Sequence, residues 1–205
     1  MEYLDYYDAN GNFLGSETRD RVHGLGLWHK TVHCWLYDDA GNVYFQLRSE
    51  SKKMYTTASG HVSAGETLEQ AFAREVLEEI GVDVDLKGAE MVEIIAWKMD
   101  KKKPDGSVWR DRAFSNAYVN KISEKTTNFV FDPNEVAGLI KIKALDALKI
   151  LSKEIPAAPA EKITSEKTEP VQISLDDFLI NPHEIGLVKY GRILQFIVEK
   201  QCEHF

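Results

Sequence analysis

Residues 60–82 read GHVSAGETLEQAFAREVLEEIGV, and this stretch decides the fold. Its second half predicts a helix that starts after Thr67, because the Thr67 side chain can cap the first turn and Gln70 completes a capping box. Gly81 can end the helix in a left-handed conformation. The segment before the helix, residues 60–66, is then a loop whose glycines allow a tight turn.

Three glutamates gather on one side of this helix, because Glu78 and Glu79 follow Glu75 by three and four residues. Their like charges repel, and the helix macrodipole disfavours anions in the last turn by about 0.3–1 kcal/mol each. Glu75 and Glu79 also share a sector with Phe72, on a face that otherwise looks buried, whereas a solubilising acidic cluster would lie opposite. The pattern therefore predicts a site for a divalent cation. Carboxylate oxygens suit Mg²⁺, with Mn²⁺ as an alternative.

The same segment resembles the signature of the Nudix hydrolase family, G-x5-E-x7-R-E-U-x-E-E-x-G-U, in which U is bulky and aliphatic. Every specified position matches, and the flanking strands extend the resemblance over roughly residues 28–151. The resemblance implies an α+β fold of the Nudix type, an α/β/α sandwich around a mixed sheet. It also implies Mg²⁺-dependent hydrolysis of a diphosphate bond in a small nucleoside-diphosphate-type metabolite, by water attack at phosphorus.

The resemblance also assigns roles to individual residues. The implied metal ligands are three carboxylates and one backbone carbonyl, namely Glu75, Glu78, Glu79 and Ser59. Glu75 or Glu79 is our first choice for the catalytic base that accepts the proton of the attacking water. Two carboxylates outside the motif are further candidates for this base, Asp111 and Glu135. Arg74 and Glu66 are expected to lie behind the ligands, where a salt bridge between Arg74 and an acidic neighbour would orient them.

A more particular resemblance is carried by LWHK at residues 27–30 and SGH at residues 59–61. These segments resemble the isopentenyl-diphosphate isomerase branch of the same superfamily, in which histidines matching His23, His29 and His61 bind a metal. An isomerase-like enzyme is therefore an alternative function. A non-catalytic ligand-binding module with the Nudix fold is another, since the fold alone does not fix the function.

The isomerase resemblance implies substrate-binding roles for Arg48 and Lys52, which match its diphosphate-binding positions, and we also assign His61 to the substrate. Two departures favour hydrolysis. Ser59 stands where the isomerase has a catalytic cysteine, and residues 110–112 (RDR) replace its essential glutamates. We therefore interpret the three histidines as structural or substrate-facing.

Four regions are predicted along the chain: an N-terminal hairpin extension at 1–27, the Nudix domain at 28–153, a mobile linker at 154–172, and a C-terminal helical extension packing on the domain at 173–205. Asn10-Gly11 marks the turn of the first hairpin, and the linker is inferred from its proline and alanine content. Three tryptophans are interpreted first as core residues, namely Trp28, Trp97 and Trp109.

Composition limits the partners. The net charge of −8 disfavours binding to a nucleic-acid polymer, so a small-molecule diphosphate is the expected partner. The sequence has only two cysteines, Cys34 and Cys202, so it does not indicate a disulfide framework. No apolar run approaches the about 20 residues of a membrane span, so no membrane partner and a cytoplasmic location are expected. A homodimer is left open.

Overall fold

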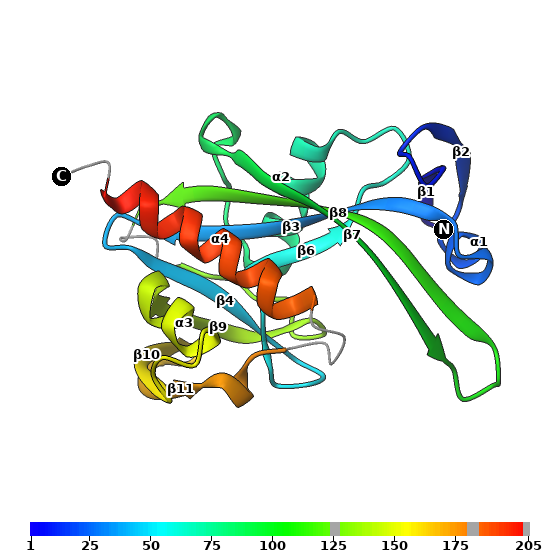
Figure 1. Ribbon diagram of the computed structural model, residues 1–205. Helices are drawn as coiled ribbons and strands as arrows, with labels where there is room; N and C mark the ends of the chain where they lie inside the picture. The colour runs from blue at the N-terminus through cyan, green and yellow to red at the C-terminus, as the bar shows by residue number, and fades with distance from the viewer. Residues whose placement is uncertain (124–127, 180–184, 203–205) are drawn as a thin grey trace.

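The computed structural model describes residues 1–123, 128–179 and 185–202, in which strands form one mixed sheet with helices on both faces (Figure 1). The strands are β1 (Tyr3–Tyr7), β2 (Phe13–Thr18), β3 (Trp28–Asp38), β4 (Asn42–Arg48), β5 (Met54–Tyr55), β6 (Ala58–His61), β7 (Glu90–Lys102), β8 (Val108–Ile122), β9 (Val136–Lys143), β10 (Ala157–Ile163) and β11 (Thr168–Ser174). The helices are α1 (Arg19–Leu25), α2 (Leu68–Ile80), α3 (Ala144–Leu151) and α4 (Ile185–Cys202), with short 3-10 turns η1 (Leu86–Gly88) and η2 (Leu175–Asp177). The predicted α+β class is confirmed.

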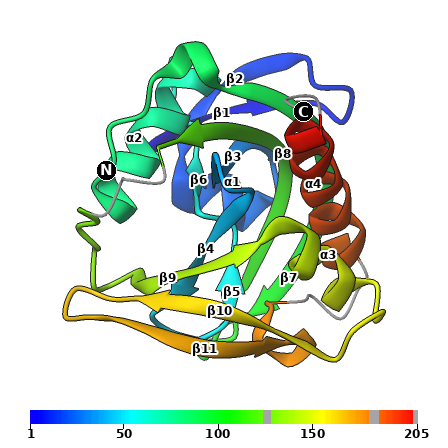
Figure 2. The same cartoon turned by 90° about the vertical axis from the view of Figure 1, so that its left-hand side faces the viewer.

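Strand β3 explains the layers, because its successive side chains point to opposite faces of the sheet. Cys34 and Leu36 are buried in a cluster with α2, whereas Trp35 and Tyr37 are buried in a second cluster with α3 and α4. Figure 2 shows α2 and α4 on opposite sides of the strands. The sheet therefore has two buried faces, as the α/β/α prediction requires.

The two edges of β3 are used differently. One edge pairs in parallel with β8 from Trp28 to Asp38. The other edge is shared in turn by β1, β6 and β4, and β4 pairs with β3 only at Leu36 and Tyr37. Strand β4 then continues with β5 and β9. The sheet thus forks beside the middle of β3, and β6, which leads into the motif, lies in the fork.

The predicted motif helix is confirmed as α2. The Thr67 hydroxyl accepts a hydrogen bond from the Gln70 backbone, the Gln70 side chain bonds back to Thr67, and Gly81 ends the helix at φ 71°. The loop before α2 is held by the N-terminal hairpin, since the Ala64 backbone N–H donates to the Tyr3 carbonyl over 2.8 Å. The predicted hairpin β1–β2 therefore buttresses the motif.

The prediction of a mobile linker at 154–172 is wrong, because β10 and β11 form a hairpin there and β10 continues the sheet beside β9. Ala158 and Ala160 are buried on one face of β10, and such small side chains give a weak strand signal in the sequence. Pro170 lies in β11, at the edge of the sheet, where a missing N–H is tolerated.

The predicted C-terminal helical extension contains the helix α4. Tyr190, Leu194 and Ile197 are buried against the sheet and α3, as expected for packing residues, whereas the side chain of Leu187 lies outside the described residues. Within the described ranges, no helix is both long enough and apolar enough to span a membrane.

Candidate active site

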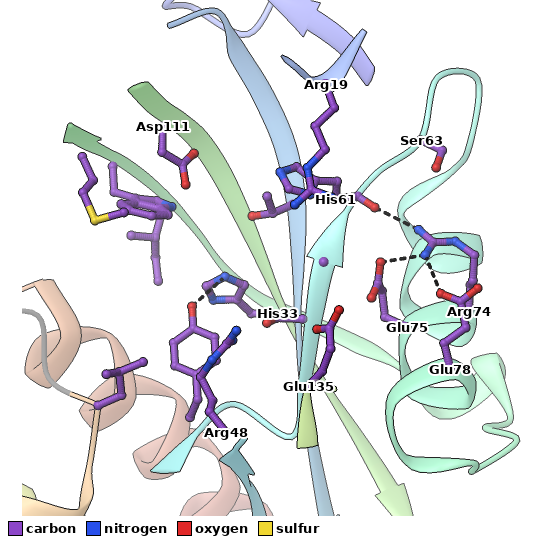
Figure 3. A pocket seen from close by; sticks show the side chains of 18 of the residues that line it. Arg19, His33, Arg48, His61, Ser63, Arg74, Glu75, Glu78, Asp111 and Glu135 are labelled. Carbon is purple, nitrogen blue, oxygen red and sulfur yellow. Dashed lines mark hydrogen bonds and ion pairs between the residues drawn. The ribbon is translucent and has the colours of Figure 1, made fainter. Parts of the chain in front are cut away.

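A cavity of about 960 Å³ opens at the fork of the sheet, between β6, β7, β8 and the second half of α2 (Figure 3). Eight of the residues predicted for the site line it, namely Arg48, Ser59, His61, Arg74, Glu75, Glu78, Asp111 and Glu135. Glu79 lies behind this lining, only 3% exposed. Lys52 is exposed in the turn after β4, at φ 55°, and is not among the lining residues.

Glu79 is a buried carboxylate held at both oxygens. Gln46 Nε2 donates to one oxygen over 2.9 Å, and the Ser59 backbone N–H faces the other at 3.4 Å. Burial, together with the charges of Glu75 and Glu135, raises the pKa of Glu79 to about 8. A carboxylate in this position is costly to ionise unless a cation binds beside it.

Glu75 lies against the backbone of Gly60. A Cβ atom on Gly60 would lie 2.0 Å from Glu75 Oε1, so any larger residue here would displace the carboxylate from this position. Burial raises the pKa of Glu75, although the adjacent Arg74 opposes the shift. Glu78 is 60% exposed and completes a row of carboxylates at the cavity wall (Figure 3).

Arg74 connects the loop before α2 to these glutamates. Its Nε and Nη2 atoms donate to the two oxygens of Glu66 over 2.8 and 2.9 Å. Its Nη1 atom donates to Glu75 over 2.7 Å and to Glu78 over 3.1 Å, and Nη2 also donates to the His61 carbonyl. Hydrogen bonding to Glu66 is the main reason why the pKa of Arg74 is raised, so it stays a cation.

These residues fit a hard divalent cation. Two carboxylates with raised pKa values lie close together, and the backbone cradle beside Glu75 admits no side chain. The single guanidinium of Arg74 is shared with Glu66, so it does not balance all the charge of the three glutamates. Oxygen donors of this kind suit Mg²⁺ or Mn²⁺.

Opposite these carboxylates, the structure brings His23, His29 and His61 together, with ring nitrogens within 4.8 Å of one another. Backbone carbonyls accept from Nδ1 of His23 and His29, at 2.9 and 3.2 Å, so the Nε2 atoms of both rings are turned toward the cluster, where His23 Nε2 lies 3.3 Å from His61 Nε2. Burial lowers the pKa of His29 to about 4 and that of His61 to about 2. Neutral imidazoles are the form that binds metals.

Asp111 joins this cluster from β8. Its Oδ1 atom lies 3.4 Å from His29 Nε2, yet neither atom has a hydrogen-bond partner among the described residues. Burial raises the pKa of Asp111 to about 6. Because His29 Nε2 and Asp111 Oδ1 both act as acceptors here, their close approach indicates a proton or cation between them. Of the residues 110–112 that replace the glutamates of the isomerase, Asp111 is therefore the one that lies at the histidines.

The tryptophan interpretation also needs correction, since all three residues are only partly buried. Trp97 lines the cavity, Trp109 stacks on His23 with ring centroids 3.8 Å apart, and Trp28 stacks on Phe114. The buried tryptophan of the core is Trp35. Strand alternation cannot identify the side of a hairpin that faces a cavity.

Several residues that line the cavity were not predicted, among them Glu2, Arg19 and Tyr55. Gln46, which holds Glu79, was not predicted either. Glu2 and Arg19 reach the cavity because the hairpin and α1 fold back on the motif loop, and nothing local in the sequence signals this. Gln46 does carry a signal, because a polar residue at an inward position of the apolar strand β4 needs a buried partner.

Residues 27–163 match the NUDIX domain family. An uncharacterized Nudix hydrolase of Clostridium acetobutylicum is 29% identical over 92% of this chain and 94% of its own length. An isopentenyl-diphosphate Delta-isomerase of Mycolicibacterium vanbaalenii is 35% identical over 40% of this chain and 49% of its own length.

Solved structures show the same fold. A protein from Deinococcus radiodurans superposes with a TM-score of 0.54 at 20% identity, covering 74% of this chain and 89% of its own. A MutT/nudix family protein from Enterococcus faecalis gives a TM-score of 0.51 at 13% identity, covering 83% of this chain and 62% of its own. The fold, the intact motif and the match over most of its length make this chain a member of the Nudix hydrolase family, whose enzymes act on pyrophosphate bonds.

Proposed function

We propose that this protein hydrolyses a diphosphate bond in a small nucleoside-diphosphate-type metabolite, by attack of water at phosphorus and with Mg²⁺ as its cation. The observation that carries the proposal is the pair Glu75 and Glu79. Glu75 lines the cavity, Glu79 is buried directly behind it, and burial raises the pKa of both carboxyl groups. A protein with a net charge of −8 can still bind a small anionic substrate at this cavity, because a bound cation reverses the local electrostatic field.

The proposed ligand set is Glu75, Glu78, Glu79 and the carbonyl of Ser59. The cation, when bound, supplies charge neutralisation at the diphosphate and lowers the pKa of a coordinated water. Glu75 or Glu79 accepts the proton of the attacking water, and Glu135, whose charge already acts on both, is a further candidate. Gln46 and Arg74 hold these carboxylates in place.

The diphosphate is proposed to bind between the carboxylates of α2 and the arginines that line the cavity. Arg48 lines the cavity opposite Glu75 and Glu78, and Arg19 enters beside His61 (Figure 3). Arginine guanidinium groups bind phosphate oxygens through paired N–H donors. His61 is proposed to contact the substrate as well, whereas Lys52 reaches it only if the turn after β4 moves inward.

The experiment is a panel of diphosphate compounds assayed with Mg²⁺ and with a chelator, with products separated so that hydrolysis is distinguished from isomerisation. We expect hydrolysis that requires the cation, and a loss of about 100-fold or more in kcat for Glu79→Gln. Glu69→Gln is the matched control, because Glu69 lies on the same helix away from the cavity. Unchanged turnover in Glu79→Gln would rule out the assigned mechanism, and binding without turnover would favour the ligand-binding module.

A second candidate, an isomerase-like enzyme, is supported by the cluster of His23, His29, His61 and Asp111. Its nitrogen donors suit a borderline metal such as Zn²⁺ better than Mg²⁺. Ser59 argues against it, because a hydroxyl lacks the acidity of the cysteine in that branch. Zn²⁺ titration of the protein and of Asp111→Asn tests the cluster, and conversion of a prenyl diphosphate without hydrolysis would replace the first proposal.

A further inference from the structure

The cavity has a second side that the hydrolytic mechanism does not use. Ile95, Trp97 and Met99 alternate along β7, so their side chains share one face of the strand, and all three line the cavity. Ile94 points to the opposite face and is 54% exposed. One side of β7 therefore gives the cavity an apolar wall about three side chains long.

The C-terminal extension completes this wall. Leu179 and Tyr190 line the cavity, although both lie beyond residue 163, where the family match ends. The Leu179 backbone N–H donates to the Met54 carbonyl over 2.8 Å. Tyr190 is 1% exposed and packs edge-on against Trp35, with ring centroids 5.2 Å apart. These contacts fix the extension as part of the cavity.

The polar atoms of this wall are already used within the protein. Trp97 Nε1 donates to the Ser115 hydroxyl over 2.8 Å, and the Tyr190 hydroxyl donates to the Leu179 carbonyl over 3.4 Å. The Tyr55 hydroxyl shares a hydrogen bond with His33 Nε2. The wall therefore offers apolar and aromatic surface to a ligand, and its aromatic donors are committed elsewhere.

The opposite side of the cavity is charged. Glu75, Glu78 and Arg74 lie together there, across the cavity from His33 and Arg48 in Figure 3. Arg48 marks the boundary, because its guanidinium lies 5.6 Å from the centroid of the Tyr55 ring. A molecule with a diphosphate at one end and an apolar or flat group at the other would match both sides of this cavity.

We propose that the wall formed by Ile95, Trp97, Met99, Leu179 and Tyr190 is the specificity site, and that it selects the non-phosphate group of the substrate by apolar contact. This inference rests on the proposed diphosphate hydrolysis. The recognised group is a flat or apolar surface, which a nucleobase or a hydrocarbon chain supplies. Because the donors of the wall are committed, the enzyme discriminates poorly among bases but strongly against diphosphates that lack such a group.

The test compares kcat/KM for ADP, CDP, GDP, geranyl diphosphate and methyl diphosphate. We expect the kcat/KM values of the three nucleotides to agree within about fivefold. If the natural group is a hydrocarbon, the kcat/KM of geranyl diphosphate should exceed them. In either case the kcat/KM of methyl diphosphate should be at least about tenfold lower than that of the best compound. Ile95→Ala and Trp97→Ala should lose at least about tenfold on the best compound and less on methyl diphosphate. Trp97→Phe, which keeps the flat surface but not the N–H, should retain most activity.

Ile94→Ala is the matched control for Ile95→Ala, because it shortens the same side chain on the other face of β7. Thermal unfolding of each variant checks that it is folded. Tryptophan fluorescence gives a second readout, because the change in fluorescence on substrate binding should be lost in Trp97→Phe. Discrimination among the bases above about tenfold, or equal losses in the Ile94 and Ile95 variants, would overturn the specificity site. Absence of turnover for every compound would instead overturn the hydrolysis itself.

Discussion

The side-chain amide of Gln46 donates a hydrogen bond to Glu79, with Nε2 2.9 Å from Oε2 and both side chains buried. Gln46 belongs to β4 and Glu79 to α2, so this bond joins the sheet to the motif helix across the fork. It fixes the carboxylate in one orientation before any cation arrives. A metal ligand that is already ordered binds the cation without a further loss of side-chain conformational entropy.

Replacing Gln46 by leucine should therefore weaken the cation site more than the fold. A buried acceptor without its partner costs about 1–3 kcal/mol, and loss of a group that orients a metal ligand typically costs about 10–100-fold in affinity or activity. The measurement is a Mg²⁺ titration of kcat with parallel thermal unfolding. Gln195→Leu is the control, since Gln195 makes a similar 2.8 Å bond to Glu199 on the exposed face of α4. Equal Mg²⁺ dependence in the two variants would contradict the assigned role.

The raised pKa of Glu79 predicts how the stability of the cation-free protein depends on pH. Folding raises this pKa from the ordinary 4.5 to about 8, so the folded state holds the proton more tightly than the unfolded state. The resulting contribution to stability is complete below the unfolded pKa and is lost as the pH rises through the folded pKa. In a chelator, the melting temperature should therefore fall from about pH 5 to about pH 9.

Mg²⁺ should reverse this trend, because it binds the ionised carboxylates, and the rise in melting temperature that it causes should be larger at pH 9 than at pH 6. Glu79→Gln removes the titrating group, so its melting temperature in chelator should vary less with pH. A Glu79→Gln profile that overlays the profile of the unmodified protein would show that other groups cause the dependence.

Gly60→Ala should abolish the cation site by displacing Glu75, because the new Cβ would lie 2.0 Å from a carboxylate oxygen. The backbone of Gly60 does not have a positive φ, so the loss is not due to backbone strain. Gly24→Ala is the matched control, since a Cβ there meets nothing within 4 Å. Circular dichroism and Mg²⁺ binding by calorimetry distinguish the outcomes. A folded Gly60→Ala variant that binds Mg²⁺ normally would refute the assignment of Glu75.

Local patterns were sufficient for much of the fold. The helix α2, its capping box and its glycine stop follow from residues within one segment, and the hairpins around Asn10-Gly11 and residues 38–42 follow from turn residues between apolar strands. The carboxylate cluster was also predictable, because helix spacing alone brings Glu75 and Glu79 to one face. These features depend on interactions within about ten residues of chain.

Features that depend on distant contacts were not predictable in the same way. The hairpin of β10 and β11 was mistaken for a linker because alanine and proline carry little strand signal. Pairing with β9 and burial of Ala158 and Ala160 in the core stabilise it there. Asp111 was named from the sequence only as a candidate base, whereas its position beside His29 depends on strand β8. Such juxtapositions are set by the pairing of β3 with β8, which no local pattern specifies.

Arg74→Lys should impair catalysis while leaving the positive charge in place. The guanidinium makes two parallel bonds to Glu66 and further bonds to Glu75 and Glu78, whereas an ammonium group cannot reproduce this planar fork. We expect kcat to fall by about 10–100-fold, with a higher Mg²⁺ requirement and little change in melting temperature. Arg192→Lys is the control, because Arg192 is 65% exposed and its ion pair with Glu93 tolerates a change of shape. If Arg74→Lys retained full activity, charge alone would orient the glutamates and the geometry of the fork would be irrelevant.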